Sequence, residues 1–179
     1  MSSLLILYST TDGQTRRICE RIQALLAARQ HQVTLINLPD ADRELGAAGL
    51  APFDKVVIGA SIRYGKHQPA VFDFVRRHAV ALAARPSAFF TVNVVARKPA
   101  KNTPDTNPYM KKFLKQVPWQ PTRLGVFAGK INYPIYSFRD RHVIRFIMWM
   151  TKGPTQPDAV VEFTDWQKVE AFAGEIESM

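Results

Sequence analysis

The most constraining feature of this sequence is a buried strand that runs into a hydroxyl-rich loop and then into a helix. Leu4–Tyr8 is a continuous apolar run, as expected for a parallel strand covered on both faces. Residues 15–28 then repeat apolar side chains at helical spacing. The intervening loop holds three hydroxyl side chains and a glycine, just before helical N–H groups that lack partners in the helix. This pattern favours a bound phosphate.

The loop differs from two common phosphate-binding motifs. It lacks both the Gly-Lys-Ser/Thr of nucleoside-triphosphate loops and the Gly-x-Gly-x-x-Gly of dinucleotide sites. It contains no basic residue, so backbone and hydroxyl groups would hold the anion. A plain helix cap is the alternative, because Ser, Thr and Asp are common where helices begin. The residues expected at the phosphate are Ser9, Thr10, Thr11, Asp12, Gly13, Gln14 and Thr15.

Strand and helix patterns alternate along the rest of the chain. Five strands separated by helices predict an α/β fold with a doubly wound parallel sheet, in a single domain over residues 1–179. Ligands of such sheets bind beyond the carboxyl ends of the strands, which here means the loops after Tyr8, Gly59 and Val92. The later strands are expected at 32–38, 55–59, 88–95 and 124–128, and the later helices at 69–84, 108–116, 139–150 and from Thr164.

Positive charge is concentrated in one stretch of the chain. The net charge of +9 arises entirely between residues 97 and 145, which contain eleven Lys or Arg and two Asp. Residues 97–122 within this stretch are expected to form a basic insertion. Such a stretch attracts nucleic acid, anionic lipid or an acidic substrate. A solvated basic surface without a partner is the alternative.

Other features bound the compartment and the chemistry. Cys19 is the only cysteine, so no internal disulfide forms, which suits a reducing compartment. The first residues do not resemble a signal peptide, and no apolar run approaches the roughly 18–20 residues that span a bilayer. No group of His, Cys and carboxylate residues has the spacing of metal ligands, so no metal is expected.

The first loop is specific enough to suggest a family. Residues 6–15, continued to Ile22, resemble the FMN-phosphate signature of flavodoxins, although Cys19 stands where that signature usually has alanine. From about residue 4 to about residue 177 the chain also resembles the menaquinone-dependent protoporphyrinogen IX dehydrogenases, the flavodoxin-like protoporphyrinogen oxidases of bacteria. The strings that carry this second resemblance are residues 57–65, 86–89, 94–99 and 164–166.

This resemblance implies a flavodoxin-like sheet of order 2-1-3-4-5 with helices on both faces, and FMN as cofactor. It implies oxidation of protoporphyrinogen IX to protoporphyrin IX in haem biosynthesis, with electrons passed to menaquinone or ubiquinone. It also implies a peripheral location on the cytoplasmic face of the inner membrane, against an anionic surface. Contacts to the flavin ring are expected from Ser61, Ile62, Arg63, Tyr64, Gly65, Asn93, Val94, Val95 and Ala96.

The implied substrate carries two propionates, so cationic side chains near these loops are candidates for binding it. His67 is the best placed general base by sequence, and a solvent-facing loop histidine is the alternative. The candidate substrate-binding residues are Arg63, Lys66, Arg97, Lys98 and Lys101.

Residues 138–152 are expected to form a helix that is both basic and apolar. Val143, Phe146, Ile147 and Met150 would share one side of it, with basic residues largely on another. Such a helix can lie in a membrane interface. The alternative is a helix that packs on the sheet, as is usual at this point of a flavodoxin fold, and leaves its charged edge in water.

Two other functions fit parts of the sequence. A flavodoxin-like electron carrier or an NAD(P)H:quinone reductase would share the fold, although carriers of this fold tend to be acidic. A nucleic-acid-binding module would explain why Tyr109, Phe113 and Trp119 are interleaved with lysines. That module would leave the phosphate loop without a purpose, and the chain has no recognised nucleic-acid motif. No nucleic-acid partner is therefore expected.

Overall fold

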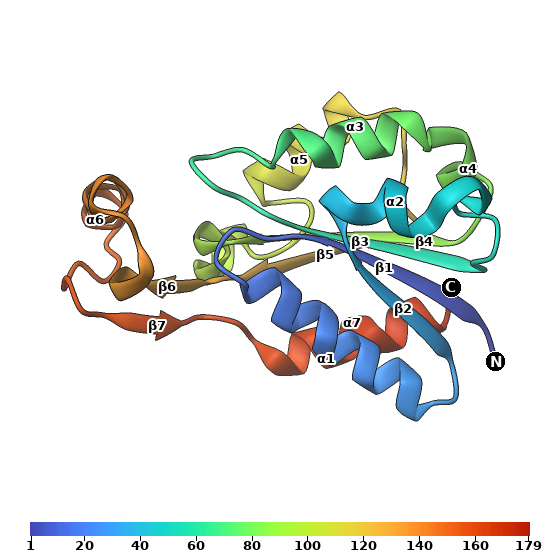
Figure 1. Cartoon of the computed structure of the whole chain (residues 1–179). Coiled ribbons are helices and arrows are strands. Elements are labelled where there is room, and N and C mark those ends of the chain that lie inside the picture. The colour runs from blue at the N-terminus through green and yellow to red at the C-terminus, as the bar shows by residue number, and fades with distance from the viewer.

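A five-stranded parallel sheet forms the centre of the protein (Figure 1). The computed structural model describes residues 1–179. The strand order is β2-β1-β3-β4-β5, which confirms the predicted fold class and order. The strands are β1 (Ser3–Ser9), β2 (Gln32–Asn37), β3 (Lys55–Ser61), β4 (Ser87–Asn93) and β5 (Arg123–Ala128).

Helices cover both faces of the sheet, and each face has its own apolar core. Alternate side chains of β1 show the division: Leu5 and Leu7 belong to a core of 21 buried residues, and Leu4 and Ile6 to one of 15. One face carries α1 (Gln14–Ala28) and α7 (Trp166–Glu177), as Figure 1 shows. The other carries α2 (Ala41–Leu45), α3 (Pro69–Arg77), α4 (Ala79–Ala83) and α5 (Pro108–Gln116).

Two helix boundaries differ from the sequence expectation. The helix expected over 69–84 is interrupted at His78, which separates α3 from α4. The last helix begins at Trp166, and Asp165 caps it by accepting a hydrogen bond from the Lys168 N–H at 3.1 Å. The helix was expected to begin at Thr164, but this residue lies before the helix and its hydroxyl donates to the Ala128 carbonyl at 2.7 Å. Thr164 therefore ties this segment to β5.

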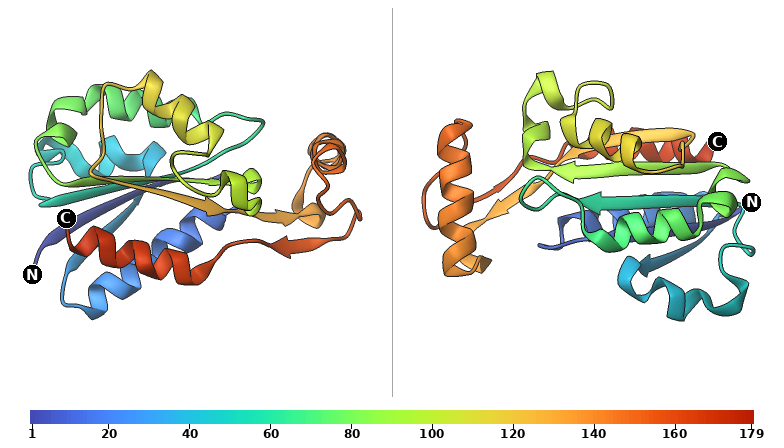
Figure 2. Two further views of the ribbon diagram at one scale, coloured as in Figure 1. Left: turned by 180° about the vertical axis from the view of Figure 1, so that it is seen from behind. Right: turned by 90° about the horizontal axis from the view of Figure 1, so that it is seen from above.

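Residues 130–162 extend beyond the carboxyl edge of the sheet, and we call them the arm. They comprise β6 (Lys130–Asn132), a 3₁₀ turn (Tyr133–Ile135), α6 (Phe138–Met150) and β7 (Val160–Glu162). Strands β6 and β7 pair antiparallel, and α6 stands past them, away from both faces of the sheet (Figures 1 and 2). The alternative that this helix packs on the sheet is therefore wrong, and α7 is the helix that packs beside α1.

The apolar residues of α6 divide between two sides of the helix. Met148 is buried against the arm's own small core, with Ile131, Tyr133 and Tyr136. Ile147 also packs against this core rather than sharing the outer side with Phe146. The outer side exposes Phe138, Val143, Phe146, Trp149 and Met150. The helices of this structure are all too short or too polar to cross a bilayer.

Candidate functional site

The three loops singled out from the sequence meet at the carboxyl edge of the sheet and line one cavity, which we call the edge cavity. They contribute Thr10, Thr11, Asp12, Gln14, Thr15, the run 61–65 and the run 92–95. The sheet topology brings them together because β1, β3 and β4 are neighbours and parallel. The remaining lining residues are Tyr109, Gly129, Lys130, Ile131, Tyr136, Ile144, Ile147 and Met148.

The first loop is built to receive an anion. Gly13 adopts φ 85°, a left-handed conformation that favours glycine, and its N–H donates to Thr10 Oγ1 at 3.0 Å. No side chain caps the start of α1, so its first-turn N–H groups stay free for a ligand. The Thr15 hydroxyl is buried and has no hydrogen-bond partner. Since buried polar groups are normally paired, this hydroxyl is an unfilled contact.

The second loop is a tight hairpin turn. Arg63 and Lys66 exchange backbone hydrogen bonds at 2.9 and 3.1 Å. Between them, Tyr64 and Gly65 adopt φ 50° and 76°, as a two-residue turn with positive φ at both positions requires. Tyr64 is half exposed, and its hydroxyl donates to Asp140 of α6. The hydroxyl of Ser61, at the base of the loop, is buried without a partner and is a second unfilled contact.

Arg63 ties the arm to the first loop. Its guanidinium contacts Asp12 at 2.7 Å and Asp140 at 2.9 Å, and it lies 5.3 and 5.0 Å from the ring centres of Tyr64 and Tyr136. Burial raises the pKa of Asp12, although Arg63 opposes that shift. The hydrogen bond from Tyr64 is the main cause that lowers the pKa of Asp140. We call this cluster of Asp12, Arg63, Tyr64 and Asp140 the clasp.

The third loop continues β4 into a 3₁₀ helix. Asn93 caps it by accepting a hydrogen bond from the Ala96 N–H at 3.0 Å. Arg97 donates to the Val94 carbonyl at 3.0 Å and to the Thr151 carbonyl at 2.8 Å, just after α6. Burial lowers the pKa of Arg97. Arg97 therefore anchors the end of α6.

The predicted site residues do not all reach the edge cavity. Ser9, Gly13 and Ala96 are not among the lining residues. The Ser9 hydroxyl donates to Gln68 Oε1 at 2.9 Å. The Gln14 amide lines the cavity but donates to Glu162 and Thr164. The other predicted residues of the second and third loops, 61–65 and 93–95, line the edge cavity.

The candidate substrate cations and the candidate base are also scattered. Arg63 and Arg97 are engaged with the arm, whereas Lys66, Lys98 and Lys101 lie outside the lining of the edge cavity. His67 is buried and lines a second cavity instead. The structure therefore does not bring His67 to the place where a general base would act on a substrate in the edge cavity.

Sequence reasoning missed the wall that the arm supplies. Ile144, Ile147 and Met148 of α6 line the cavity with Tyr136, and Lys130 of β6 lines it too. No local pattern marks these residues as ligand contacts, because the fold of the arm brings them back to the sheet edge. Tyr109 was predicted only as one of the aromatic residues interleaved with lysines, and not as a residue of this cavity.

The residues present suit a flavin mononucleotide. An uncapped helix start and the unpaired Thr15 hydroxyl match a phosphate, and the unpaired Ser61 hydroxyl matches a polar part of such a ligand. Apolar side chains from the third loop and the inner side of α6 match a flat ring. These donors and this wall make one continuous lining.

Comparisons with known proteins agree with the geometry. The family described as flavodoxin domain matches residues 5–158. A protein of Escherichia coli K12 named protoporphyrinogen IX dehydrogenase [quinone] is 45% identical over 96% of this chain and 93% of its own length. A Leishmania major protein of the same name is 43% identical over 98% of this chain and 74% of its own length.

Solved structures of low sequence identity share the fold. An archaeal flavodoxin superposes with a TM-score of 0.55 at 13% identity, covering 98% of this chain and 96% of its own. Oxidised flavodoxin 1 of Bacillus cereus gives a TM-score of 0.53 at 14% identity, covering 99% and 98%. With these matches, the chain belongs to the flavodoxin domain family and, within it, to the family of proteins named protoporphyrinogen IX dehydrogenase [quinone].

Proposed function

We propose that this chain oxidises protoporphyrinogen IX to protoporphyrin IX on a bound FMN and passes the electrons to a membrane quinone, menaquinone or ubiquinone, in haem biosynthesis. The observation that carries the proposal is 45% identity along 96% of the chain to relatives named for that substrate and acceptor. The edge cavity supports it with a phosphate loop and an apolar wall. Because the insertion and the arm both line this cavity, we also propose that residues 1–179 act as one domain with a basic insertion at 97–122.

The residues of the edge cavity divide the work of binding. Bound FMN supplies an acceptor and donor of two electrons, which no side chain of the cavity offers. The start of α1 and the Thr15 hydroxyl would hold the phosphate, and the Ser61 hydroxyl would donate to another polar group of the ligand. Val94, Val95 and the inner side of α6 cover the ring and exclude water. Tyr64 stands at the opening, held by Asp140.

Substrate carboxylates are received by lysines rather than by the two arginines of the loops. Arg63 and Arg97 already donate to groups of the arm, namely the Asp140 carboxylate and the Thr151 carbonyl. Moving these two arginines toward a substrate would release the arm. Lys130 lines the edge cavity, and Lys98 and Lys101 follow the third loop, where Lys98 is half-buried and Lys101 is exposed. Their flexible ammonium groups suit propionates that enter with a large macrocycle. No side chain is assigned as a general base.

We also propose that the protein lies on the cytoplasmic face of an anionic inner membrane, as a peripheral protein that contacts the lipid through the arm. Its outer side exposes Phe146 and Trp149 at 56% and 70%, with Arg139 and Lys152 also exposed. An apolar helix side bordered by cations lies well in a lipid interface. The opposite side of the same helix lines the edge cavity, so a quinone leaving the bilayer would meet the cavity directly.

The activity is tested by porphyrin formation under anaerobic conditions. We expect the FMN-loaded chain to produce porphyrin fluorescence from protoporphyrinogen IX only when a menaquinone analogue is present, above a control without enzyme. Absence of this quinone-dependent signal from the loaded protein would contradict the proposal. Quinone reduction driven by NADPH instead would favour a soluble quinone reductase.

The cofactor site is tested separately by FMN titration of Thr15→Val. Removing the unpaired buried hydroxyl without changing its shape should raise the Kd for FMN about tenfold. The matched control is Thr34→Val on the exposed edge strand β2, which should leave the Kd unchanged. Equal affinities in both variants would remove Thr15 from the phosphate site.

A further inference from the structure

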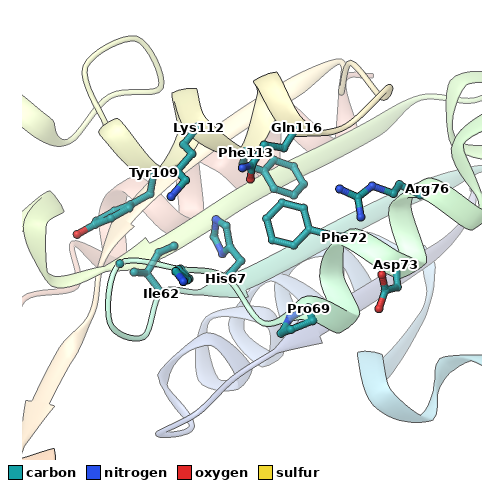
Figure 3. Close-up of a pocket in the computed structure, with 12 residues that line it drawn as sticks. Ile62, His67, Pro69, Phe72, Asp73, Arg76, Tyr109, Lys112, Phe113 and Gln116 are labelled. Carbon is teal, nitrogen blue, oxygen red and sulfur yellow. The ribbon is translucent and has the colours of Figure 1, made fainter.

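A second cavity, which we call the side cavity, lies between α3 and α5 (Figure 3). Its volume is about 440 Å³, within the range of small-molecule sites. Ile62, Gly65 and Tyr109 line both this cavity and the edge cavity, so the two are neighbours on either side of the second loop. None of the contacts proposed above for FMN or the porphyrinogen requires the side cavity.

His67 presents an unpaired acceptor to the side cavity. The side chain is 6% exposed, and its Nδ1 lies 3.1 Å from the Ser61 carbonyl oxygen. A carbonyl oxygen only accepts, so Nδ1 carries the proton and Nε2 of the neutral ring is an acceptor. Burial lowers the pKa of His67 to about 4, which keeps the ring neutral at pH 7. Nε2 is buried and has no partner.

Aromatic rings surround this acceptor. The ring centres of Phe72 and Phe113 lie 6.4 and 5.4 Å from that of His67, both nearly edge-on. Figure 3 shows the imidazole rising from the second loop toward α5, with the two phenylalanines beside it. Walls of this kind accept a flat apolar ring. A ligand that fills them and satisfies Nε2 must carry an O–H or N–H donor on an aromatic ring.

The rim of the side cavity is cationic. Lys66, Arg76 and Lys112 line it, against one carboxylate, Asp73. None of the three cations forms an ion pair in the structure. Arg76 lies 5.7 Å from the ring centre of Phe72, so its charge is held over the aromatic wall. The rim therefore favours a ligand with a negative group at the end opposite its donor.

From these groups we propose that the side cavity binds a planar aromatic acid that carries a hydroxyl. The ring packs against Phe72 and Phe113, the hydroxyl donates to His67 Nε2, and the carboxylate faces Lys66, Arg76 and Lys112. This site does not depend on the proposed oxidation, because it uses a different set of polar groups. Its occupant would contact Ile62, Gly65 and Tyr109, which also line the edge cavity.

The rim is tested by calorimetric titration of the FMN-loaded full chain with 6-hydroxy-2-naphthoate. We expect one binding site, and an affinity about tenfold lower for Lys112→Glu, because the variant reverses one charge of the rim. The matched control is Lys111→Glu, which makes the same change on the exposed side of α5 outside the cavity lining. No measurable binding, or equal weakening in both variants, overturns the proposal.

The buried acceptor is tested by comparing that probe with 2-naphthoate, which lacks the hydroxyl. The unmodified chain should bind 2-naphthoate about fivefold more weakly, as expected for the loss of one hydrogen bond. His67→Phe keeps an aromatic ring and removes the acceptor, so it should bind the two probes equally. Equal binding of both probes by the unmodified chain overturns the role of Nε2. If His67→Phe does not fold, the proposal is still tested by the binding of the two probes to the unmodified chain and by the two lysine variants.

Discussion

The sheet with its covering helices and the arm that leaves it are held together by different forces. The sheet rests on two cores of 21 and 15 buried residues, whereas the core of the arm has four. Three polar contacts join the arm to the sheet: Arg63 with Asp140, Arg97 with Thr151, and Arg17 with Glu162 at 3.0 Å. Val94 and Phe163 add a small apolar contact against the core of the arm. Burial thus makes the end of β1 and the start of α1 rigid, whereas the opposite wall of the edge cavity depends more on polar contacts.

This difference assigns separate tasks to the two regions. The sheet fixes the end of β1 and the start of α1, on which any phosphate contact depends. The arm presents one side of α6 to the edge cavity and the other to the surroundings. Only four buried apolar residues form the core of the arm, so the arm should open more easily than the sheet.

The largest effect is expected in the core of the sheet. Leu7→Ala removes a fully buried side chain from β1 and should lower the free energy of unfolding by roughly 2–5 kcal/mol. Val143→Ala in the arm removes a side chain that is 44% exposed and should change it by less than about 0.5 kcal/mol. Urea unfolding measures both, and equal losses would show that the two regions do not differ as described.

The free energy of unfolding should also depend on pH through His67, which is buried beside the sheet. The pKa of His67 is lowered to about 4 in the folded protein by burial, from 6.5. The unfolded chain therefore takes up its proton first, so the stability contribution is complete above pH 6.5 and is lost as the pH falls toward 4. This loss approaches about 3 kcal/mol.

His67→Phe isolates that contribution. We expect the unfolding free energy of this variant to fall less between pH 7 and pH 4.5 than that of the unmodified chain, as measured by urea titration at each pH. The carboxylates titrate in both proteins and cancel in the comparison. The same decline in both would mean that His67 is not buried in its neutral form.

A smaller and local effect is expected from opening the clasp. Asp140→Asn removes the charge that pairs with Arg63 and should speed amide hydrogen exchange in α6 while leaving β1 and β3 unchanged. The control is Asp158→Asn, which makes the same change at an exposed residue of the arm that forms no ion pair. It should leave amide exchange unchanged both in α6 and in the sheet. Faster exchange spread across the sheet would contradict a clasp confined to the arm.

The smallest effect on stability is expected on the outer side of α6, where function would still change. Phe146→Ser should alter the unfolding free energy by less than about 0.5 kcal/mol, because Phe146 is 56% exposed. It should reduce flotation with anionic vesicles, because apolar contact with the interface is lost. Val80→Ser on α4 is the control, since Val80 is 86% exposed and far from the arm. Unchanged flotation of Phe146→Ser would argue against membrane contact by α6.

The sequence predicted the sheet and the first loop well because both depend on neighbouring residues. The apolar run of β1, the glycine at φ 85° and the start of α1 lie within one short segment. The helix of the arm was predicted, but its strands β6 and β7 were missed because they have three residues each, and Ile131 pairs with Val161 across thirty positions. Such short strands have no recognisable period.

The roles of single polar residues were the hardest to predict. Arg63 was expected to meet a ligand, but its partners Asp12 and Asp140 lie 51 and 77 positions away in the chain. His67 was expected in a loop near the flavin, and it is buried among Phe72, Phe89 and Phe113 from three different elements. Only tertiary packing determines which polar groups stay free for a ligand.

The central claim is that the edge cavity holds FMN so that electrons pass from protoporphyrinogen IX to a quinone. It is tested most directly by the visible absorbance of the FMN-loaded full chain under anaerobic conditions, with protoporphyrinogen IX added first and a menaquinone analogue second. The account predicts that the flavin band falls on the first addition and returns on the second, as porphyrin absorbance appears. A flavin band that protoporphyrinogen IX leaves unchanged, in protein that NADPH or dithionite still bleaches, would contradict it.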